Sequence, residues 1–182
     1  MVRLWCLAIS VMLTTLGWAA EFQLSSPTIK GQGKIGQEHV FAGFGCRGGN
    51  VSPALQWQGA PRDTKSFALT MYDPDAPTGS GWWHWVIFNL PPTLSALPAN
   101  AGKPDGSAAP AGSIQSITDF GQPGYGGPCP PAGDKPHRYI FTLYALKLDQ
   151  VPLKSDASGA MVGFYLNQNM IAKASFTAFY GR

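Results

Sequence analysis

The chain has 182 residues, about the length of a single domain. Apolar residues make up 45% of it and charged residues only 13%, a balance that can fill a core and that excludes an intrinsically disordered chain. The formal net charge of +3 is too small to indicate binding to nucleic acid or to an anionic membrane surface. The 22 glycines and 16 prolines are scattered and favour a β-rich, loop-rich fold over a helical bundle.

The first twenty residues have the pattern of a secretory signal peptide. Arg3 provides a positive charge, an apolar run follows from Leu4 to Leu16, and Gly17-Trp-Ala-Ala20 offers a small-x-small cleavage site. An uncleaved membrane anchor fits less well, because the run is shorter than the ~20 residues that span a bilayer. We therefore expect a signal peptide over residues 1–20 and an exported domain over residues 21–182.

Removal of that signal peptide leaves two cysteines, Cys46 and Cys129. Two cysteines in an exported protein are typical of one disulfide, and two buried free thiols are the alternative. A bridge that closes so long a loop stabilises a fold by roughly 4–5 kcal/mol in the chain-entropy model.

Four segments have the length and residue types of strands: residues 66–72, 84–90, 138–146 and 174–180. Residues 40–44 and 55–57 are weaker strand candidates. Residues 92–136 are rich in proline and glycine and are expected to form mostly loop, which at that length is usually functional.

One helix is expected near the C-terminal end of the chain. Apolar residues recur at helical spacing over residues 160–172, and Ser155, Asp156 or Ser158 can cap the first turn. Its methionine and aromatic residues are interpreted as core.

The most informative stretch is residues 71–91, where two carboxylates and a histidine lie among prolines and tryptophans. Pro74 and Pro77 fix their own φ and hold the preceding residue in extended geometry. Asp73 therefore has little conformational freedom, and Asp75 is confined between the two prolines. This rigid acidic segment predicts a polar wall of a binding pocket.

A second informative stretch, residues 126–139, leads directly into a predicted strand. Side chains alternate across a strand, so we expect His137 and Tyr139 on one face and Arg138 on the other. A histidine thus stands at the entrance of this strand, beside a proline-rich loop.

His84 stands in the same way at the entrance of an earlier strand. Alternation places it on one face with Val86 and Phe88, while Trp85 points to the opposite face and is expected in the core. His39 lies in a polar segment without this context and is expected at the surface.

Together these motifs closely resemble the phosphatidylethanolamine-binding protein family, which includes the Raf kinase inhibitor proteins. The matching motifs are Asp73-Pro-Asp-Ala-Pro77, Trp83-His84 leading into Trp85-Val-Ile-Phe-Asn89, and Pro136-His-Arg-Tyr139. The bacterial YbhB/YbcL-like branch is most similar, through Pro74-Asp-Ala-Pro-Thr-Gly-Ser-Gly-Trp-Trp-His84 and Gly127-Pro-Cys-Pro-Pro131. The resemblance covers roughly residues 22–180.

The resemblance implies a mainly β fold, an antiparallel β-sandwich with one or two short helices and a small cavity at one end. In this family the cavity binds an anion, such as the phosphate of a lipid headgroup. The motifs place six residues in the cavity of this chain: Asp73, Asp75, Pro77, His84, His137 and Tyr139. Residues 126–131 would form part of its rim. Eukaryotic members close the pocket with a C-terminal helix, whereas this chain ends shortly after its last predicted strand.

Carboxylates repel an anion, so Asp73 and Asp75 are expected to act on the imidazoles. A carboxylate that accepts a hydrogen bond from one ring nitrogen fixes the tautomer and raises the pKa of the histidine. The other nitrogen and the Tyr139 hydroxyl can then donate to the ligand. We expect an exported, periplasmic, non-enzymatic protein that binds a small anionic or phosphorylated ligand without a cofactor or metal. Its affinity should rise as the pH falls, and the resemblance leaves a homodimer open.

Two other classes of function remain open. A protein-interaction or inhibitor module is the first, because family members inhibit kinases or proteases; Trp82 and Trp83 could serve such recognition or shape the pocket mouth. A hydrolase that uses the aspartates and histidines is the second, although the chain has no Gly-x-Ser-x-Gly or His-Glu-x-x-His motif. Residues 31–36 and 43–48 match the dinucleotide-binding pattern, but outside a βαβ context, and are interpreted as turns.

Overall fold

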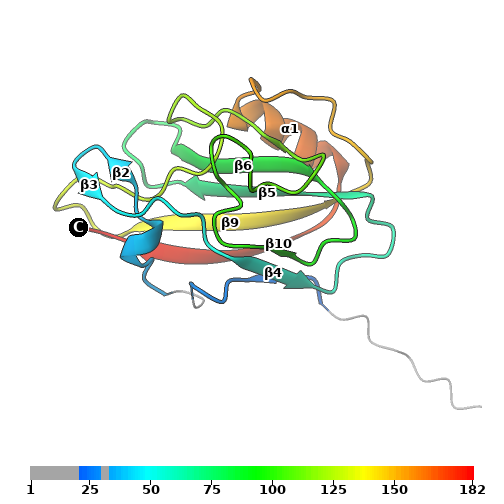
Figure 1. The fold of residues 1–182 in the computed structure, drawn as a ribbon, viewed down its shortest axis with the longest axis horizontal. Coiled ribbons are helices and arrows are strands. Elements are labelled where there is room, and N and C mark those ends of the chain that lie inside the picture. The colour runs from blue at the N-terminus through cyan, green and yellow to red at the C-terminus, as the bar shows by residue number, and fades with distance from the viewer. Residues whose placement is uncertain (1–20, 30–32) are drawn as a thin grey trace, which may run out of the picture.

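The computed structural model describes residues 21–29 and 33–182, so the expected signal peptide over residues 1–20 lies outside the described residues. Strands dominate the described part of the chain (Figure 1). In chain order the elements are β1 (Gln23–Ser25), the 3-10 helix η1 (Gln37–His39), β2 (Ala42–Gly43), β3 (Cys46–Arg47), β4 (Leu55–Gln58), β5 (Ser66–Asp73), β6 (Trp82–Leu90), β7 (Ala96–Leu97), β8 (Ile114–Gln115), β9 (His137–Leu146), α1 (Gly159–Asn169) and β10 (Met170–Tyr180).

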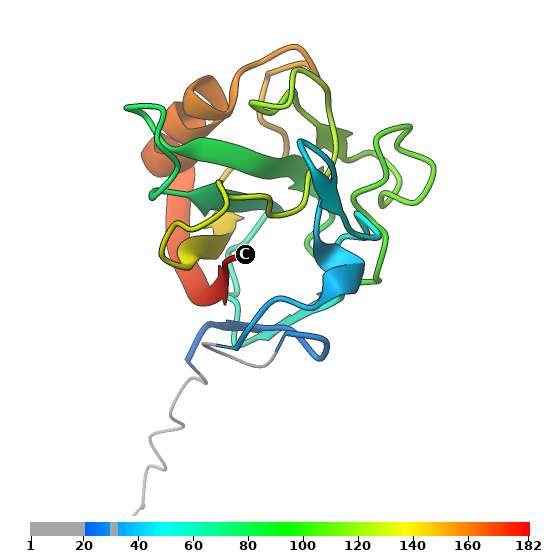
Figure 2. The same ribbon diagram turned by 90° about the vertical axis from the view of Figure 1, so that its left-hand side faces the viewer.

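Two antiparallel sheets form the layers of the fold. The larger has the strand order β10-β9-β5-β6-β8, the smaller has the order β1-β4-β7, and β2 and β3 form a separate hairpin. The two sheets lie on opposite sides of the main core, and α1 covers the outer face of the larger sheet (Figures 1 and 2). The predicted mainly β, antiparallel sandwich is therefore confirmed.

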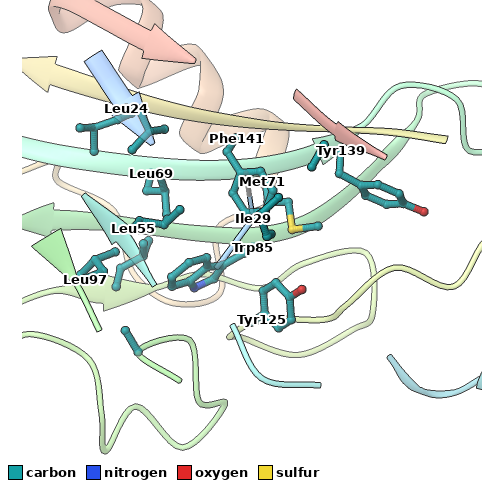
Figure 3. Close-up of a cluster of buried hydrophobic side chains, with 14 of the residues drawn as sticks. Leu24, Ile29, Leu55, Leu69, Met71, Trp85, Leu97, Tyr125, Tyr139 and Phe141 are labelled. Atoms are coloured by element: carbon teal, nitrogen blue, oxygen red, sulfur yellow. The ribbon is translucent and has the colours of Figure 1, made fainter. Parts of the chain in front are cut away.

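The main core fills the space between the sheets. Leu55 and Trp57 of β4 belong to the same buried cluster as Leu69 of β5 and Trp85 of β6. Trp85 is fully buried, as expected. Figure 3 shows this cluster, with Tyr139 at one end and its hydroxyl directed away from the other labelled side chains.

The central strands are apolar on both faces because both faces are covered. On β5, Leu69 and Met71 face the main core, whereas Ala68 belongs to a second cluster that includes Val162 and Leu166 of α1. A strand covered on both faces has a nearly continuous apolar sequence instead of an alternating one. This explains why the central strands are recognisable from composition alone.

The strand predictions hold for the main elements: residues 66–72 form most of β5, 84–90 lie in β6, 138–146 lie in β9, 174–180 lie in β10, and 55–57 lie in β4. The candidate at residues 40–44 is wrong over most of its length. Only Ala42 and Gly43 pair with β3, and Phe44 turns the chain with a φ of 50°. Residues 43–48 span this hairpin turn, as interpreted.

The helix prediction is right at its start and wrong at its end. Ser158 is the N-cap, and its hydroxyl oxygen accepts a hydrogen bond from the Met161 N–H at 3.2 Å. Residues 170–172 are not helical, because the backbone becomes extended at Met170, which pairs with Leu146 of β9. The last apolar residues of the periodic pattern, 170–172, therefore belong to β10 of the larger sheet.

The prediction of a surface position for His39 is wrong. The residue is 2% exposed, and its Nδ1 donates to the Val51 carbonyl at 2.7 Å. Its own carbonyl accepts from the Tyr125 hydroxyl at 2.8 Å. A Cβ added to Gly127 would lie 2.1 Å from the same oxygen, so the glycine allows this close packing. Glycine-rich loops therefore bury a segment whose composition suggests exposure.

Candidate functional site

Three strand ends meet at one edge of the larger sheet. Because β5 runs antiparallel to both β6 and β9, the last residue of β5 lies beside the first residues of its two neighbours. Asp73 ends β5, His84 is near the start of β6, and His137 begins β9. The antiparallel topology thus gathers residues that are up to 64 positions apart in the chain.

A pocket of about 140 Å³ opens at this edge. Its lining contains five of the six residues expected there: Asp73, Pro77, His84, His137 and Tyr139. The remaining lining comes from Trp82, the first residue of β6, and from the loops around the pocket: Phe44, Ala76, Thr78, Phe120, Cys129, Pro130 and Pro131. The expected contribution of residues 126–131 is thus limited to their last three members.

A β-bulge directs His84 into the pocket. Met71 pairs with Trp85 and Tyr72 pairs with Trp83, so His84 has no partner on β5. The extra residue reverses the alternation before it. Trp83 therefore packs with the cluster beneath α1, where alternation had placed His84, and the prediction that His84 shares a face with Val86 and Phe88 is wrong. Its ring instead lies edge-on to Tyr139, with centroids 5.1 Å apart.

Asp73 organises one wall of the pocket. Its Oδ2 accepts a hydrogen bond from His137 Nδ1 at 2.8 Å, and both side chains are about 95% buried. Its Oδ1 accepts from the backbone N–H groups of Asp75 and Ala76 at 2.8 and 3.1 Å. One carboxylate therefore fixes the 73–76 turn and the orientation of the imidazole, as expected for Asp73.

The other side of the His137 ring faces a second carboxylate. His137 Nε2 lies 3.5 Å from Asp134 Oδ2, on the loop that precedes β9. Asp134 is half-exposed, so solvent weakens its interaction with the imidazole. No motif in the sequence marked Asp134 as part of this site.

Asp75 does not line the pocket, which corrects the expectation from the sequence. It turns outward and accepts hydrogen bonds from the backbone N–H and the guanidinium of Arg138, the residue that alternation places on the outer face. These hydrogen bonds, chiefly those from the guanidinium, lower the pKa of Asp75 to about 2. Asp75 therefore stabilises the start of β9 from outside the pocket.

The Asp75 carboxyl should accordingly titrate near pH 2 in the folded protein. Its folded pKa is depressed, so its contribution to stability is present above about pH 4 and is lost as the pH falls toward 2. Carboxyl-detected NMR titration measures this midpoint directly. In an Arg138→Gln variant the midpoint should rise toward 3.8, and an unchanged midpoint would contradict the assigned cause.

Burial controls the protonation of His84. Its Nδ1 lies 2.7 Å from the Gly126 carbonyl, which can only accept, so Nδ1 carries the hydrogen. Removal from solvent lowers the pKa of His84 to about 4, despite the opposing effects of this hydrogen bond and of Asp73 and Asp119. The expected rise in histidine pKa is therefore wrong for His84, which is neutral near pH 7.

Two buried hydrogen-bond donors in the lining have no partner among the described residues. They are the Tyr139 hydroxyl and the Trp82 indole N–H. Burial also raises the pKa of Tyr139, so its hydroxyl keeps its proton. Because an unpaired buried donor costs about 1–3 kcal/mol, such groups in a pocket wall indicate a place for a ligand acceptor.

An aromatic rim surrounds the pocket mouth. Phe120 lies at its centre, with ring centroids 4.5 Å from Phe41, 5.4 Å from Trp82 and 6.0 Å from Phe44. Phe44 is 68% exposed at the tip of the β2–β3 hairpin. Sequence reasoning identified Trp82 as a residue that could shape the mouth, but it missed the three phenylalanines.

Two links hold the rim loops together. Cys46 of β3 forms a disulfide with Cys129, as predicted. Arg182 donates to the Pro130 carbonyl at 2.7 Å and to the Phe44 carbonyl at 3.3 Å. Arg182 thus stabilises the rim loops and is not part of the pocket lining.

Two structural features are absent from residues 21–29 and 33–182. No cluster of three or more histidine, cysteine, aspartate and glutamate side chains is arranged to hold a metal ion. Within the same described ranges, no helix has both the length and the apolar character needed to cross a membrane.

These features define a class of protein, an antiparallel β-sandwich with a small, partly polar pocket at one end. Residues 25–181 match the family model described as "Phosphatidylethanolamine-binding protein". The chain belongs to this family.

Relatives in curated proteins and solved structures agree with this assignment. The chain is 54% identical to the YbcL protein of Escherichia coli K12 over 168 residues, which is 92% of each chain. It is 48% identical to YbhB of the same organism over 158 residues, covering 87% of this chain and 99% of YbhB. The crystal structure of E. coli YbcL superposes with a TM-score of 0.88 at 55% identity, covering 90% of this chain and 99% of YbcL. A putative family homologue from Chlamydia trachomatis gives a TM-score of 0.73 at 29% identity, covering 88% and 97%.

Proposed function

We propose that this protein is an exported, non-enzymatic binding protein that takes a small anionic group, such as the phosphate of a lipid headgroup, into the pocket at the end of β5. The observation that carries the proposal is the pair of buried, unpartnered donors, Tyr139 Oη and Trp82 Nε1, in the wall of that pocket. An oxygen-rich ligand group would satisfy both donors.

The size of the pocket favours a headgroup over a whole lipid or a larger metabolite. Pockets for drug-sized ligands usually measure about 300–1,000 Å³. A volume of about 140 Å³ accommodates a group of phosphate size, and the rest of the ligand would then leave through the aromatic rim.

The chemistry of the lining supports binding without catalysis. The Thr78 hydroxyl donates to the Gly81 carbonyl, and Cys129 is oxidised in the disulfide. His84 Nδ1 is bonded to the backbone, and His137 Nδ1 is bonded to Asp73. The described lining therefore has no free threonine hydroxyl or cysteine thiol to act as a nucleophile.

The disulfide also supports export. Structural disulfides persist in oxidising compartments such as the bacterial periplasm and are rare in the cytosol. A periplasmic location is consistent with the Cys46–Cys129 bridge and with the expected signal peptide.

Replacement of one tyrosine hydroxyl tests the proposal. A Tyr139→Phe variant should bind phosphoethanolamine about 10- to 100-fold more weakly than the wild type, because it lacks one hydrogen bond to a charged group. Its stability should not fall, because the hydroxyl has no hydrogen-bond partner among the described residues. Isothermal titration calorimetry at pH 5.5 measures the affinity, and urea unfolding measures the stability.

Tyr125→Phe is the matched control. Tyr125 is also a buried tyrosine, but its hydroxyl donates to the His39 carbonyl and lies outside the pocket lining. This variant should lose about 1–2 kcal/mol of stability and keep its affinity. Equal affinities for the wild type and Tyr139→Phe, or no binding by the wild type at pH 5.5 and 7.5, would contradict the proposal.

A protein-interaction module is the second candidate, and the exposed Phe44 favours it. A large aromatic side chain that is 68% exposed on a cross-linked hairpin is a suitable anchor for a protein partner. A protein partner that binds the Tyr139→Phe variant but not a Phe44→Ser variant would establish this function separately from ligand binding in the pocket.

A further inference from the structure

We propose that the pocket selects a protonated monoanion, a phosphate or phosphonate group that keeps one O–H, over the dianion of the same group. The inference rests on the proposed function, because it specifies which form of the anion the same pocket takes. It follows from three properties of the lining: few free donors, no net positive charge, and one ring nitrogen that can only accept.

Backbone donors on one side of the pocket are already used. The N–H groups of Asp75 and Ala76 donate to Asp73 Oδ1, and the N–H of Thr78 donates to the Ala76 carbonyl. Pro74 and Pro77, the other residues of this turn, have no N–H. Residues 74–78 therefore offer no free backbone donor to a ligand.

The opposite loop is poor in donors for the same reason. Pro128, Pro130 and Pro131 have no N–H, so only Cys129 carries one within residues 128–131. Sites for phosphate dianions usually present several converging N–H groups, as at a helix N-terminus or in a glycine-rich loop. Neither residues 74–78 nor residues 128–131 have that form.

Positive charge is also missing. The described lining contains no lysine or arginine. It contains the Asp73 carboxylate, His84, which is neutral, and His137. The net charge of the lining is therefore zero when His137 is charged and −1 when His137 is neutral. Asp119 and Asp134 lie nearby and add negative potential at His84 and His137 respectively. The guanidiniums of Arg138 and Arg182 lie outside the lining and are engaged by Asp75 and by rim carbonyls.

His84 supplies an acceptor where a dianion needs a donor. Its Nδ1–H is directed to the Gly126 carbonyl, which leaves Nε2, at the other edge of the neutral ring, with a lone pair. No partner for Nε2 is found among the described residues, and the ring lines the pocket. This lone pair repels an unprotonated phosphate oxygen, but it accepts a hydrogen bond from a P–O–H group.

The monoanion and the dianion of one ligand should therefore differ in their free energy of binding. A monoanion can accept from Tyr139 Oη and Trp82 Nε1 and donate its own O–H to His84 Nε2. A dianion has no hydrogen to donate, places a second charge beside Asp73 and finds no cation other than His137, which is already paired with Asp73. A buried charge without a partner is costly, so the proton on the ligand decides the affinity.

Three ligands of similar size test the proposal in calorimetric titrations of the wild-type protein from pH 5 to 8. Methyl phosphate has a second pKa of about 6, so its affinity should fall about tenfold per pH unit above that value. Methylphosphonate has a higher second pKa and should give the same curve displaced to higher pH. Methyl sulfate is a monoanion without an O–H, and it should bind at least tenfold more weakly than methyl phosphate at pH 5.

Two outcomes would overturn the inference while leaving the proposed function intact. One is binding of methyl sulfate as tight as that of methyl phosphate at pH 5. The other is a pH midpoint that is the same for methyl phosphate and methylphosphonate, since that midpoint would then belong to the protein. If none of the three ligands binds, the proposed function itself fails.

A second readout observes His84 directly and needs no variant. The ¹⁵N shifts of its imidazole should show a protonated Nδ1 and an unprotonated Nε2 at pH 7, both before and after methylphosphonate is added. On binding, the Nε2 shift should move in the direction of a stronger hydrogen bond while the tautomer stays the same. A ring protonated on both nitrogens in the complex would overturn the inference.

Discussion

Loss of the Cys46–Cys129 disulfide should lower the free energy of unfolding by about 4 kcal/mol. The bridge joins residues 83 positions apart, so it removes much of the conformational freedom of the unfolded chain. Small domains have a total stability of about 5–15 kcal/mol, and the loss would therefore be a large fraction of it. A Cys46→Ala/Cys129→Ala variant, compared with the oxidised wild type in urea unfolding, measures the difference.

The same bridge holds the rim, so a second effect should accompany the loss of stability. Cys129 lines the pocket, and Cys46 belongs to β3 of the hairpin that carries Phe44. Without the bridge, the two loops are joined by the Arg182 hydrogen bonds and by the hydrogen bond from the Phe41 N–H to the Pro128 carbonyl. Phosphoethanolamine affinity should therefore fall several-fold in the double variant.

Reductant provides the control for both effects. Reduced wild type should unfold at the urea concentration of the double variant, whereas the double variant should not respond to reductant. Equal unfolding midpoints for oxidised and reduced wild type would show that the bridge contributes little, and the chain-entropy account would not apply here.

The central strands could be predicted because their local sequence and their environment agree. Residues 66–72 and 138–146 are apolar on both faces, and the sheet is covered on both faces by the main core and by α1. The short strands β7 and β8 could not be found in the same way. Each has two residues, and its pairing is decided by the longer strand beside it.

Only part of the pocket could be predicted from the sequence. Proline geometry and the histidines at strand entrances indicated the wall formed by Asp73, His84 and His137. The direction of each side chain was less predictable, because it depends on register. A single bulge at His84 reverses the alternation, and nothing in the local sequence marks it.

The outward position of Asp75 and the aromatic rim are non-local features. Asp75 has the same proline-flanked context as Asp73, yet Arg138, 63 residues later, draws it out of the pocket. Phe44 and Phe120 lie in different loops and meet only when the sheet edge brings those loops together. A family resemblance transfers motif residues, but it does not report which of them face the ligand in this chain.

Acid should destabilise this protein through His84 by up to roughly 3 kcal/mol between pH 6.5 and 4. The pKa of this histidine is about 4 in the folded protein and near 6.5 in the unfolded chain. Between these values the unfolded chain binds one more proton than the folded protein. The contribution of His84 to the stability of the folded protein is therefore complete above pH 6.5 and is lost as the pH falls to 4. Urea unfolding at half-unit pH intervals should show a slope of about 1.4 kcal/mol per pH unit from this residue.

Comparison with a His84→Asn variant isolates the contribution, because other groups also titrate in this range. An asparagine amide can still donate to the Gly126 carbonyl, but it has no titratable proton. The variant should be less stable at pH 7, and its stability should fall by about 3 kcal/mol less between pH 6.5 and 4 than that of the wild type. Identical pH slopes for the two proteins would mean that folding does not lower the pKa of His84. The folded protein would then carry a charged His84 below about pH 6.5, and the neutral acceptor would be absent at the pH where the monoanion of methyl phosphate is tested.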